Sequence, residues 1–192
     1  TMATPVLPTY NEIYSFGDSL SDAGNVSILT AVIGQEPVTP PYYQEHYGSF
    51  DGTVFSNGPT WVQNISMALK LGTEAPSLAG GTDFAYGGAE TGSTPQNSGN
   101  STTSALSLPT QLGQFTAVNP HVSNTALYTL SIGGNDVYDI LADTALTLQQ
   151  QVADVAAAVS NEVGFIKQLV ALGAKNFLVL NVPDLGKTPE VT

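Results

Sequence analysis

The chain has 192 residues, of which 42% are hydrophobic and only 10% are charged, against roughly 25% charged in an average soluble protein. Sixteen acidic residues stand against four lysines and no arginine, and there is no cysteine. The net charge of −12 argues against binding to nucleic acid or anionic lipid, and the missing cysteine excludes disulfides, thiolate metal sites and a cysteine nucleophile.

Strands and helices are expected to alternate, beginning with a β-prone segment at 12–16 that ends in a Gly-Asp-Ser turn. Residues 35–58 are rich in proline, glycine and tyrosine and are expected to form an ordered surface loop. A helix should follow from Pro59, which suits a first helical turn, with apolar residues at helical spacing behind it. Residues 82–86 are the second strand candidate, closed by Gly87-Gly88.

The second half of the chain repeats this alternation. Residues 93–107, mostly Ser, Thr, Asn and Gly, are expected to form a flexible loop. Pro109 opens a helix that should stop at Asn119-Pro120. A third strand is expected at 126–132, and it ends at a Gly-Gly turn.

The longest predicted helix runs from about Thr147 to Leu172, and Gly173 supplies its stop. A fourth strand follows at 176–182, and its nearly continuous apolar sequence predicts burial on both faces. The helix is predicted from an apolar stripe whose members recur at threes and fours: Leu148, Val152, Val155, Val159, Val163, Ile166 and Val170.

This order of elements predicts a three-layer α/β/α sandwich around a parallel, flavodoxin-like sheet. No repeat or linker divides the chain, so a single domain over residues 1–192 is expected. In such folds the chemistry gathers beyond the carboxyl ends of the strands. Three predicted strand ends carry turns suited to a site, and we expect them to meet at one rim: Gly17-Asp18-Ser19, Gly87-Gly88 and Gly133-Gly134-Asn135-Asp136.

Each turn contains one candidate functional residue. Ser19 follows a buried strand, which would hold its hydroxyl at the rim as a nucleophile requires. Gly88 would let a backbone N–H approach a cleft, and the side-chain amide of Asn135 would donate to an oxyanion. Taken singly, each is better explained by an ordinary turn or helix cap.

Together the motifs resemble those of the GDSL, or SGNH, hydrolase family. Residues 16–25 (FGDSLSDAGN) resemble its first signature block, residues 84–89 (FAYGGA) its second and residues 132–136 (IGGND) its third. Residues 56–62 (SNGPTWV) are similar to a segment that lipase-like members carry between the first two blocks. The G-x-S-x-G elbow of the α/β-hydrolases is absent.

The resemblance implies that Ser19 is the nucleophile and that its own N–H donates to the oxyanion. It adds the backbone N–H of Gly88 and the side chain of Asn135 as further donors. No metal or organic cofactor is expected, because no ligand cluster or phosphate cradle is found in the sequence. Three aspartates of the same blocks would be structural: Asp18, Asp22 and Asp136.

One block of the family pattern is missing. The family ends in a D-x-x-H block, whose histidine is the general base and whose aspartate orients it. No aspartate here has a histidine at that spacing, and His46 and His121 lie in predicted surface loops. We therefore expect the domain to be incomplete at its C-terminus. The triad Asp and His would then lie in a C-terminal remainder of the same protein, either as a separate polypeptide or lost.

The expected function is hydrolysis of short- to medium-chain acyl esters through an acyl-enzyme on Ser19. Carbohydrate acetyl esters, or acyl transfer to another acceptor, are the alternatives within the family. A non-catalytic binding module is the alternative from another class, favoured by the missing histidine and disfavoured by the intact Ser19, Gly88 and Asn135. Five loop aromatics are expected either to wall the substrate pocket or to pack their own loop: Tyr42, Tyr43, Tyr47, Phe50 and Phe55.

A secreted, extracellular protein is expected. Residues 1–8 read as a mature terminus left after processing, because the start of the chain has neither the basic residues nor the apolar centre of a signal peptide. Sequons for N-glycosylation begin at Asn25, Asn64 and Asn100 and agree weakly with a secretory route.

Overall fold

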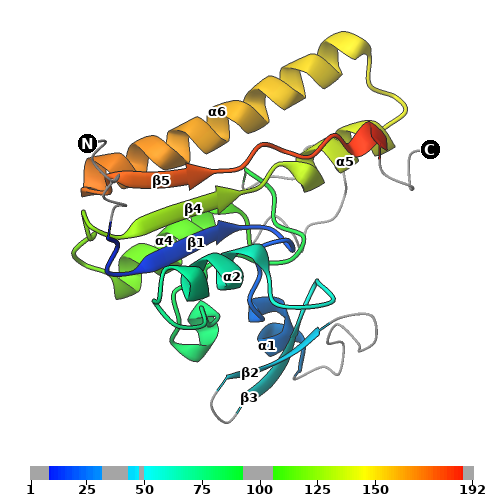
Figure 1. The fold of residues 1–192 in the computed structure, drawn as a ribbon. Helices are drawn as coiled ribbons and strands as arrows, with labels where there is room; N and C mark the ends of the chain where they lie inside the picture. Colours follow the sequence, from blue (N-terminus) through cyan, green and yellow to red (C-terminus); the bar gives the residue numbers. More distant parts are fainter. Residues whose placement is uncertain (1–8, 32–42, 48–49, 93–105, 188–192) are drawn as a thin grey trace, which may run out of the picture.

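A parallel three-stranded sheet forms the centre of the computed structural model. Its strands are β1 (Ile13–Gly17), β4 (Leu127–Ser131) and β5 (Asn176–Val179), hydrogen-bonded in the order β1-β4-β5 (Figure 1). Ile13 pairs with Leu127, which in turn pairs with Asn176, so the carboxyl ends of the strands share one edge. This arrangement confirms the predicted α/β fold with a parallel sheet. The structure describes residues 9–31, 43–47, 50–92 and 106–187.

Helices α4 (Leu108–Val118) and α6 (Leu148–Leu172) pack on one face of this sheet through an aromatic core. Phe16 of β1 contacts Phe115 of α4 and Phe165 of α6 edge to face, with ring centroids 5.4 and 5.0 Å apart. Such ring pairs add about 0.5–1.5 kcal/mol each beyond the burial of their area. The core therefore fixes both helices relative to β1.

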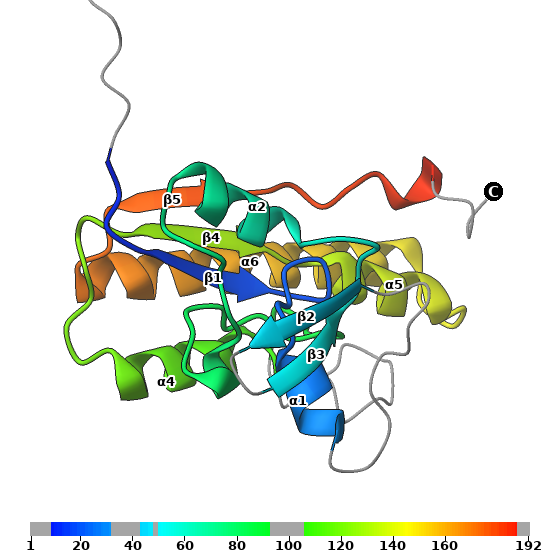
Figure 2. The same cartoon turned by 60° about the horizontal axis from the view of Figure 1, so that its bottom comes forward.

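The other face of β1 meets α2 (Trp61–Ala68) and the segment that follows it; Figure 2 shows α2 and α6 on opposite sides of the sheet. Thr60 caps α2 in a capping box with Gln63, so the helix starts at Trp61, two residues after Pro59. Four further helical segments and one hairpin complete the described fold: α1 (Asn25–Ala31), α5 (Gly134–Ala142), short 3₁₀ turns at Ser77–Ala79 and Leu185–Lys187, and the antiparallel pair β2 (Tyr43–Tyr47) and β3 (Phe50–Val54).

The hairpin is a correction to the sequence analysis, which expected only a loop at 35–58. Proline and glycine favour turns, but the segments YQEHY and FDGTV contain aromatic and β-branched residues and pair with each other. Residues 93–105 of the predicted flexible loop at 93–107 lie outside the described residues.

The strand predicted at 82–86 is also wrong. This segment runs beside β1, with Phe84 N donating to Ser15 O at 2.7 Å, but only isolated bridges form at Asp83. Thr82 and Tyr86 also bond to β1, at Ser15 N and Gly17 O. The ladder does not extend further because Gly17 N donates to the side chain of Gln111 at 2.9 Å.

The fourth strand is shorter than predicted and is not buried on both faces. Asn176, Phe177 and Leu178 are half-buried and Val179 is exposed. The reason is its place in the sheet: β5 is at the edge, and among the described residues no strand pairs with its outer side.

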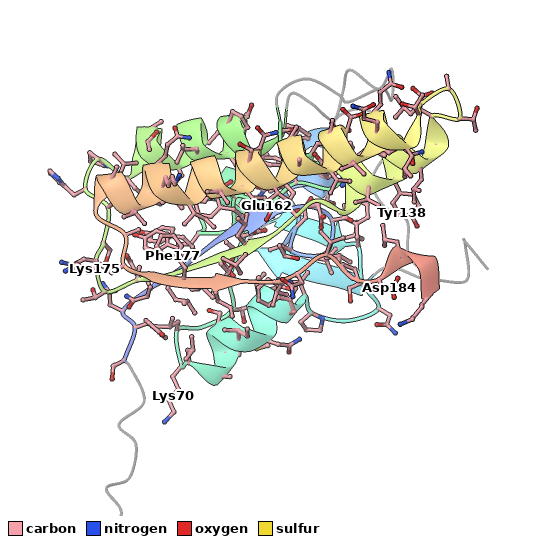
Figure 3. The ribbon with its side chains drawn as sticks, turned by 90° about the horizontal axis from the view of Figure 1, so that it is seen from above. Lys70, Tyr138, Glu162, Lys175, Phe177 and Asp184 are labelled. Carbon is pink, nitrogen blue, oxygen red and sulfur yellow. The ribbon has the colours of Figure 1, made fainter. Side chains whose placement is uncertain are left out.

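The long helix is confirmed, with a capping box of Thr147 and Gln150 at its start and Gly173 (φ 117°) at its end. Its apolar stripe, however, faces the described core only at Ile166. Leu148 is 75% exposed and Val159 55%, whereas the buried residues are Ala158, Phe165 and Leu169. Figure 3, which looks down on α6, shows no other described element over the helix. The exposed members of the stripe are Leu148, Val152, Val155, Val159, Val163 and Val170. By length and composition α6 would also suit a membrane span, but Phe165 and Leu169 belong to the core of the fold.

Candidate active site

Ser19 lies on a tight turn directly after β1. Asp18 holds this turn, because its carbonyl accepts the N–H groups of Ser21 (3.1 Å) and Asp22 (3.0 Å) and its carboxylate accepts that of Leu20 (3.0 Å). Asp18 is buried whereas Ser19 is half-buried. Ser19 therefore lies at the carboxyl edge of the sheet, on a turn that hydrogen bonds to Asp18 hold in place. These contacts agree with the structural role expected for Asp18.

Asp22 joins the first turn to the second. Its fully buried carboxylate accepts the N–H groups of Gly24 (2.7 Å) and Asn25 (2.6 Å), and it also accepts that of Gly87 at 2.8 Å. Gly88 follows with φ 80°, a conformation that favours glycine. Asp22 thus has the structural role expected for it and ties the residue before Gly88 to the loop that carries Ser19.

Asn25 reinforces the same junction. Its buried side-chain amide donates to the carbonyls of Asp83 (2.8 Å) and Ala85 (2.9 Å). A glycan on this nitrogen is incompatible with these contacts, so the sequon at Asn25 does not support secretion. The sequon at Asn64 is exposed on α2, and the one at Asn100 lies outside the described residues.

The third turn is connected to the second. Asn135 stands in the first turn of α5, and its Nδ2 donates to the carbonyl of Ala89 at 2.8 Å. Asp136 is fully buried and accepts the N–H of Thr91 at 3.1 Å and its hydroxyl at 2.6 Å. Gly88 therefore lies between residues bonded to the first turn and residues bonded to the third.

A pocket of about 270 Å³ opens at this edge of the sheet. Ser19 and Asn135 both line it, so the structure brings these two predicted residues to one cavity. Gly88 is not among its lining residues. The remaining walls come from the first turn, from β4 and α5, and from the segment after β5: Asp18, Leu20, Ser131, Ile132, Gly134, Tyr138, Val182, Pro183 and Leu185.

Some of these walls were missed by the sequence analysis. Tyr138 stands three residues after Asn135, a spacing that puts both on the same face of a helix, and this signal could have identified it. Val182 and Pro183 follow β5 at the same edge of the sheet as Ser19. A larger apolar hollow of about 460 Å³ lies between α4 and α6, and none of the three turns lines it.

Of the five aromatic residues expected to wall the pocket, only Phe55 has a described side chain. Its ring packs against Gly87, where an added Cβ would come within 2.4 Å of it, and Phe55 does not line the pocket. Tyr42 and the side chains of Tyr43, Tyr47 and Phe50 lie outside the described residues.

Of the two histidines only His121 has a described side chain, and it does not stand beside Ser19. His121 is exposed before β4, at the amino-terminal edge of the sheet, whereas Ser19 follows the carboxyl end of β1. His46 belongs to β2, and its side chain lies outside the description.

The surroundings of the pocket are acidic. Burial raises the pKa of Asp18 to about 6, with the charge of Asp136 adding to the effect and the hydrogen bond from Leu20 opposing it. Burial, together with the charge of Asp136, raises the pKa of Glu162 to about 7. Within the described ranges no group of three or more His, Asp or Glu is arranged to hold a metal ion.

A second group of buried carboxyls lies beneath the first turn, and it makes stability depend on pH. Glu74 is 3% exposed and accepts a hydrogen bond from Ser15 Oγ at 3.0 Å; burial raises its pKa to about 8. Burial, and then the charge of Glu74, also raises the pKa of Asp83. Glu74 therefore keeps its proton in the folded protein up to about pH 8, whereas the unfolded chain releases it near pH 4.3. The contribution of this group to folding stability is complete below about pH 4.3 and is lost as the pH rises to about 8.

We expect the melting temperature to fall by about 5 °C between pH 5 and pH 8, and Glu74→Gln to reduce that fall because the amide stays neutral. Thermal unfolding followed by circular dichroism measures both. Asp184→Asn removes the same charge from an exposed position and serves as the control. A fall in Glu74→Gln as large as that in the control would contradict the assignment.

Comparison with known proteins agrees with the motifs. The family model described as GDSL-like Lipase/Acylhydrolase matches residues 13–191. The chain is 30% identical over 183 residues to a phosphatidylcholine-sterol acyltransferase of Aeromonas hydrophila, covering 95% of this chain and 47% of that protein. It is also 30% identical over 183 residues to Lipase 1 of Photorhabdus luminescens (95% and 24%) and 28% identical over 187 residues to an acetylesterase of Thermothelomyces thermophilus (93% and 55%). The chain thus spans about half or less of the length of these relatives.

Proposed function

The chain belongs to the GDSL-like lipase and acylhydrolase family, and on that premise we propose that the protein hydrolyses carboxylic esters through an acyl-enzyme on Ser19. The observation that carries the proposal is the shared pocket of Ser19 and Asn135 at the carboxyl edge of the sheet. The hydrogen bonds of Asp22 to Gly87 and of Asn135 to Ala89 support a place for Gly88 in the same site.

In this mechanism Ser19 Oγ attacks the ester carbonyl carbon while a general base takes the hydroxyl proton. The carbonyl π electrons move onto oxygen, and the resulting oxyanion receives hydrogen bonds from the N–H of Ser19, the N–H of Gly88 and the Asn135 amide. Asn135 Nδ2 carries two hydrogens, and only one is used on the Ala89 carbonyl. The intermediate collapses and expels the alcohol, which takes the proton from the base. Water then cleaves the acyl-enzyme by the same route and restores the serine.

We propose that the base and its orienting aspartate belong to a C-terminal remainder of the same protein. The greater length of the relatives supports this, since the chain covers 47% of the Aeromonas protein. So does the outward apolar stripe of α6, because a surface of that kind is normally covered by another element. Intact-mass analysis of the purified native protein should find the remainder; a fully active sample containing only these 192 residues would contradict the proposal.

The walls of the pocket support the proposed substrate class. Its walls include Ile132, Val182 and Leu185, and its surroundings are acidic, which favours neutral acyl chains of short to medium length. A series of p-nitrophenyl esters measures the preference: we expect kcat/KM to be highest for butyrate and octanoate and to fall for palmitate. A maximum at palmitate would refute this substrate class, and no hydrolysis of any member by the native protein would refute the hydrolase itself.

Two alternatives have specific support. The names of the Aeromonas acyltransferase and the Thermothelomyces acetylesterase favour acyl transfer to an alcohol and removal of acetyl groups, respectively. Adding a competing alcohol to the ester assay separates the first, because a transferase would form a new ester at the expense of free acid. A non-catalytic binding module would not react with a fluorophosphonate.

Secretion is supported by the relative named secreted effector protein SseJ of Salmonella typhimurium, 29% identical over 178 residues.

A further inference from the structure

The buried side chain of Gln111 is hydrogen-bonded to the backbone of Gly17, which precedes the turn that carries Ser19. Gln111 Oε1 accepts the N–H of Gly17 at 2.9 Å, and its Nε2 donates to the carbonyl of Gly17 at 2.8 Å and to that of Leu106 at 2.9 Å. The side chain is fully buried. Both polar atoms of the Gln111 amide are therefore hydrogen-bonded, and both bond to the backbone of Gly17, which is 94 positions away in the sequence.

Other contacts also restrict the backbone of Gly17. Its φ is +153°, and a Cβ added there would lie 2.2 Å from the carbonyl oxygen of Ser131. The next residue, Asp18, donates its N–H to that same oxygen at 3.3 Å, and the Gly17 carbonyl also accepts the N–H of Tyr86 at 3.2 Å. The Gly17 carbonyl is therefore shared between Gln111 and the segment 82–86 that runs beside β1, whereas the Gly17 N–H donates to Gln111.

The position of Gln111 is itself fixed by the core. It shares the buried face of α4 with Leu108 and Phe115, at the spacing of three and four residues that aligns side chains along a helix. Phe115 packs against Phe16, the residue before Gly17. The helix and the end of β1 are therefore held together by aromatic packing and by the glutamine amide at adjacent positions.

We propose that Gln111 is a positioning residue for Ser19. By fixing both polar atoms of Gly17 it sets the direction in which the chain leaves β1, and thereby where the Ser19 hydroxyl and N–H point. Gln111 does not line the pocket, so it acts through the backbone and not on the substrate. The inference rests on the proposed role of Ser19 as nucleophile.

The test uses the intact native protein carrying Gln111→Met, which keeps the size of the side chain and removes its hydrogen bonds. The measurements are kcat and KM for p-nitrophenyl butyrate and the rate of Ser19 labelling by a fluorophosphonate. We expect kcat and the labelling rate to fall together by about 10- to 100-fold with KM within about threefold, because small displacements of a reacting group are costly. Gln114→Met is the matched control, since Gln114 lies on the same helix and accepts a hydrogen bond from the Tyr86 hydroxyl at 2.9 Å.

Equal labelling rates in Gln111→Met and Gln114→Met would overturn the proposal, even if Gln111→Met were the less stable of the two. If circular dichroism shows that Gln111→Met does not fold, Gln111→Glu carries the same comparison, because its carboxyl still accepts the Gly17 N–H. Its expected loss is smaller than that of Gln111→Met but exceeds the loss in the control, and equality again overturns the proposal. Failure of the wild type to label at Ser19 would instead refute the proposed function, so the two failures are distinct.

Discussion

Replacing Ser19 with alanine is expected to lower kcat/KM for p-nitrophenyl butyrate by at least about 10⁴-fold, because the acyl-enzyme has no other hydroxyl on which to form. The melting temperature should stay near that of the wild type, since Ser19 is half-buried and the hydrogen bonds of its turn belong to Asp18, Leu20 and Ser21. Steady-state kinetics on the purified intact protein, together with thermal unfolding, measure the two effects.

Ser160→Ala, at an exposed position on α6, is the control for this substitution and should keep full activity. A Ser19→Ala protein that retains more than about a tenth of the wild-type activity would contradict the covalent mechanism, whose loss is expected to be far larger.

Replacing Asn135 with alanine is expected to lower kcat by about 10²- to 10³-fold with little change in KM, the behaviour of a donor that acts on the oxyanion and not on the bound ester. The variant also loses the hydrogen bond to the Ala89 carbonyl, so the free energy of unfolding should fall by about 1 kcal/mol. Kinetics and denaturant unfolding of the same preparations separate the two effects.

Asn161→Ala is the matched control for Asn135. The Asn161 amide donates to the Thr91 hydroxyl at 3.2 Å, so this variant removes an amide hydrogen bond from the same network without touching the pocket. If both variants lost similar activity, Asn135 would be a structural residue and the assignment of the oxyanion donor would be wrong.

The sequence predicted those elements whose signals are local. The long helix is defined by Thr147 and Gln150 at its start and by Gly173 at its end, all within one turn of the boundary they set. The strand before Gly133 and the helix after Pro109 were identified for the same reason. Local signals also placed Ser19 and Asn135 at strand ends, and the parallel sheet brought those ends together.

What the sequence did not predict depends on distant partners. The burial of Gln111 follows from its contact with Gly17, and nothing in the helix itself marks a glutamine as internal. The stripe on α6 shows that the helix has an apolar face, but periodicity alone does not say whether the sheet or another segment covers it. The strand expected at 82–86 is reduced to isolated bridges because Gly17 N donates to the side chain of Gln111, a contact that spans 94 residues.

The most direct test of a serine nucleophile at this edge of the sheet is peptide mapping of the intact native protein after treatment with a fluorophosphonate. A phosphonylated peptide containing Ser19 is expected, with the adduct absent from Ser19→Ala and with esterase activity lost in proportion to the modification. An active preparation that carries the adduct on another residue, or that keeps its activity after Ser19 is fully modified, would contradict the mechanism.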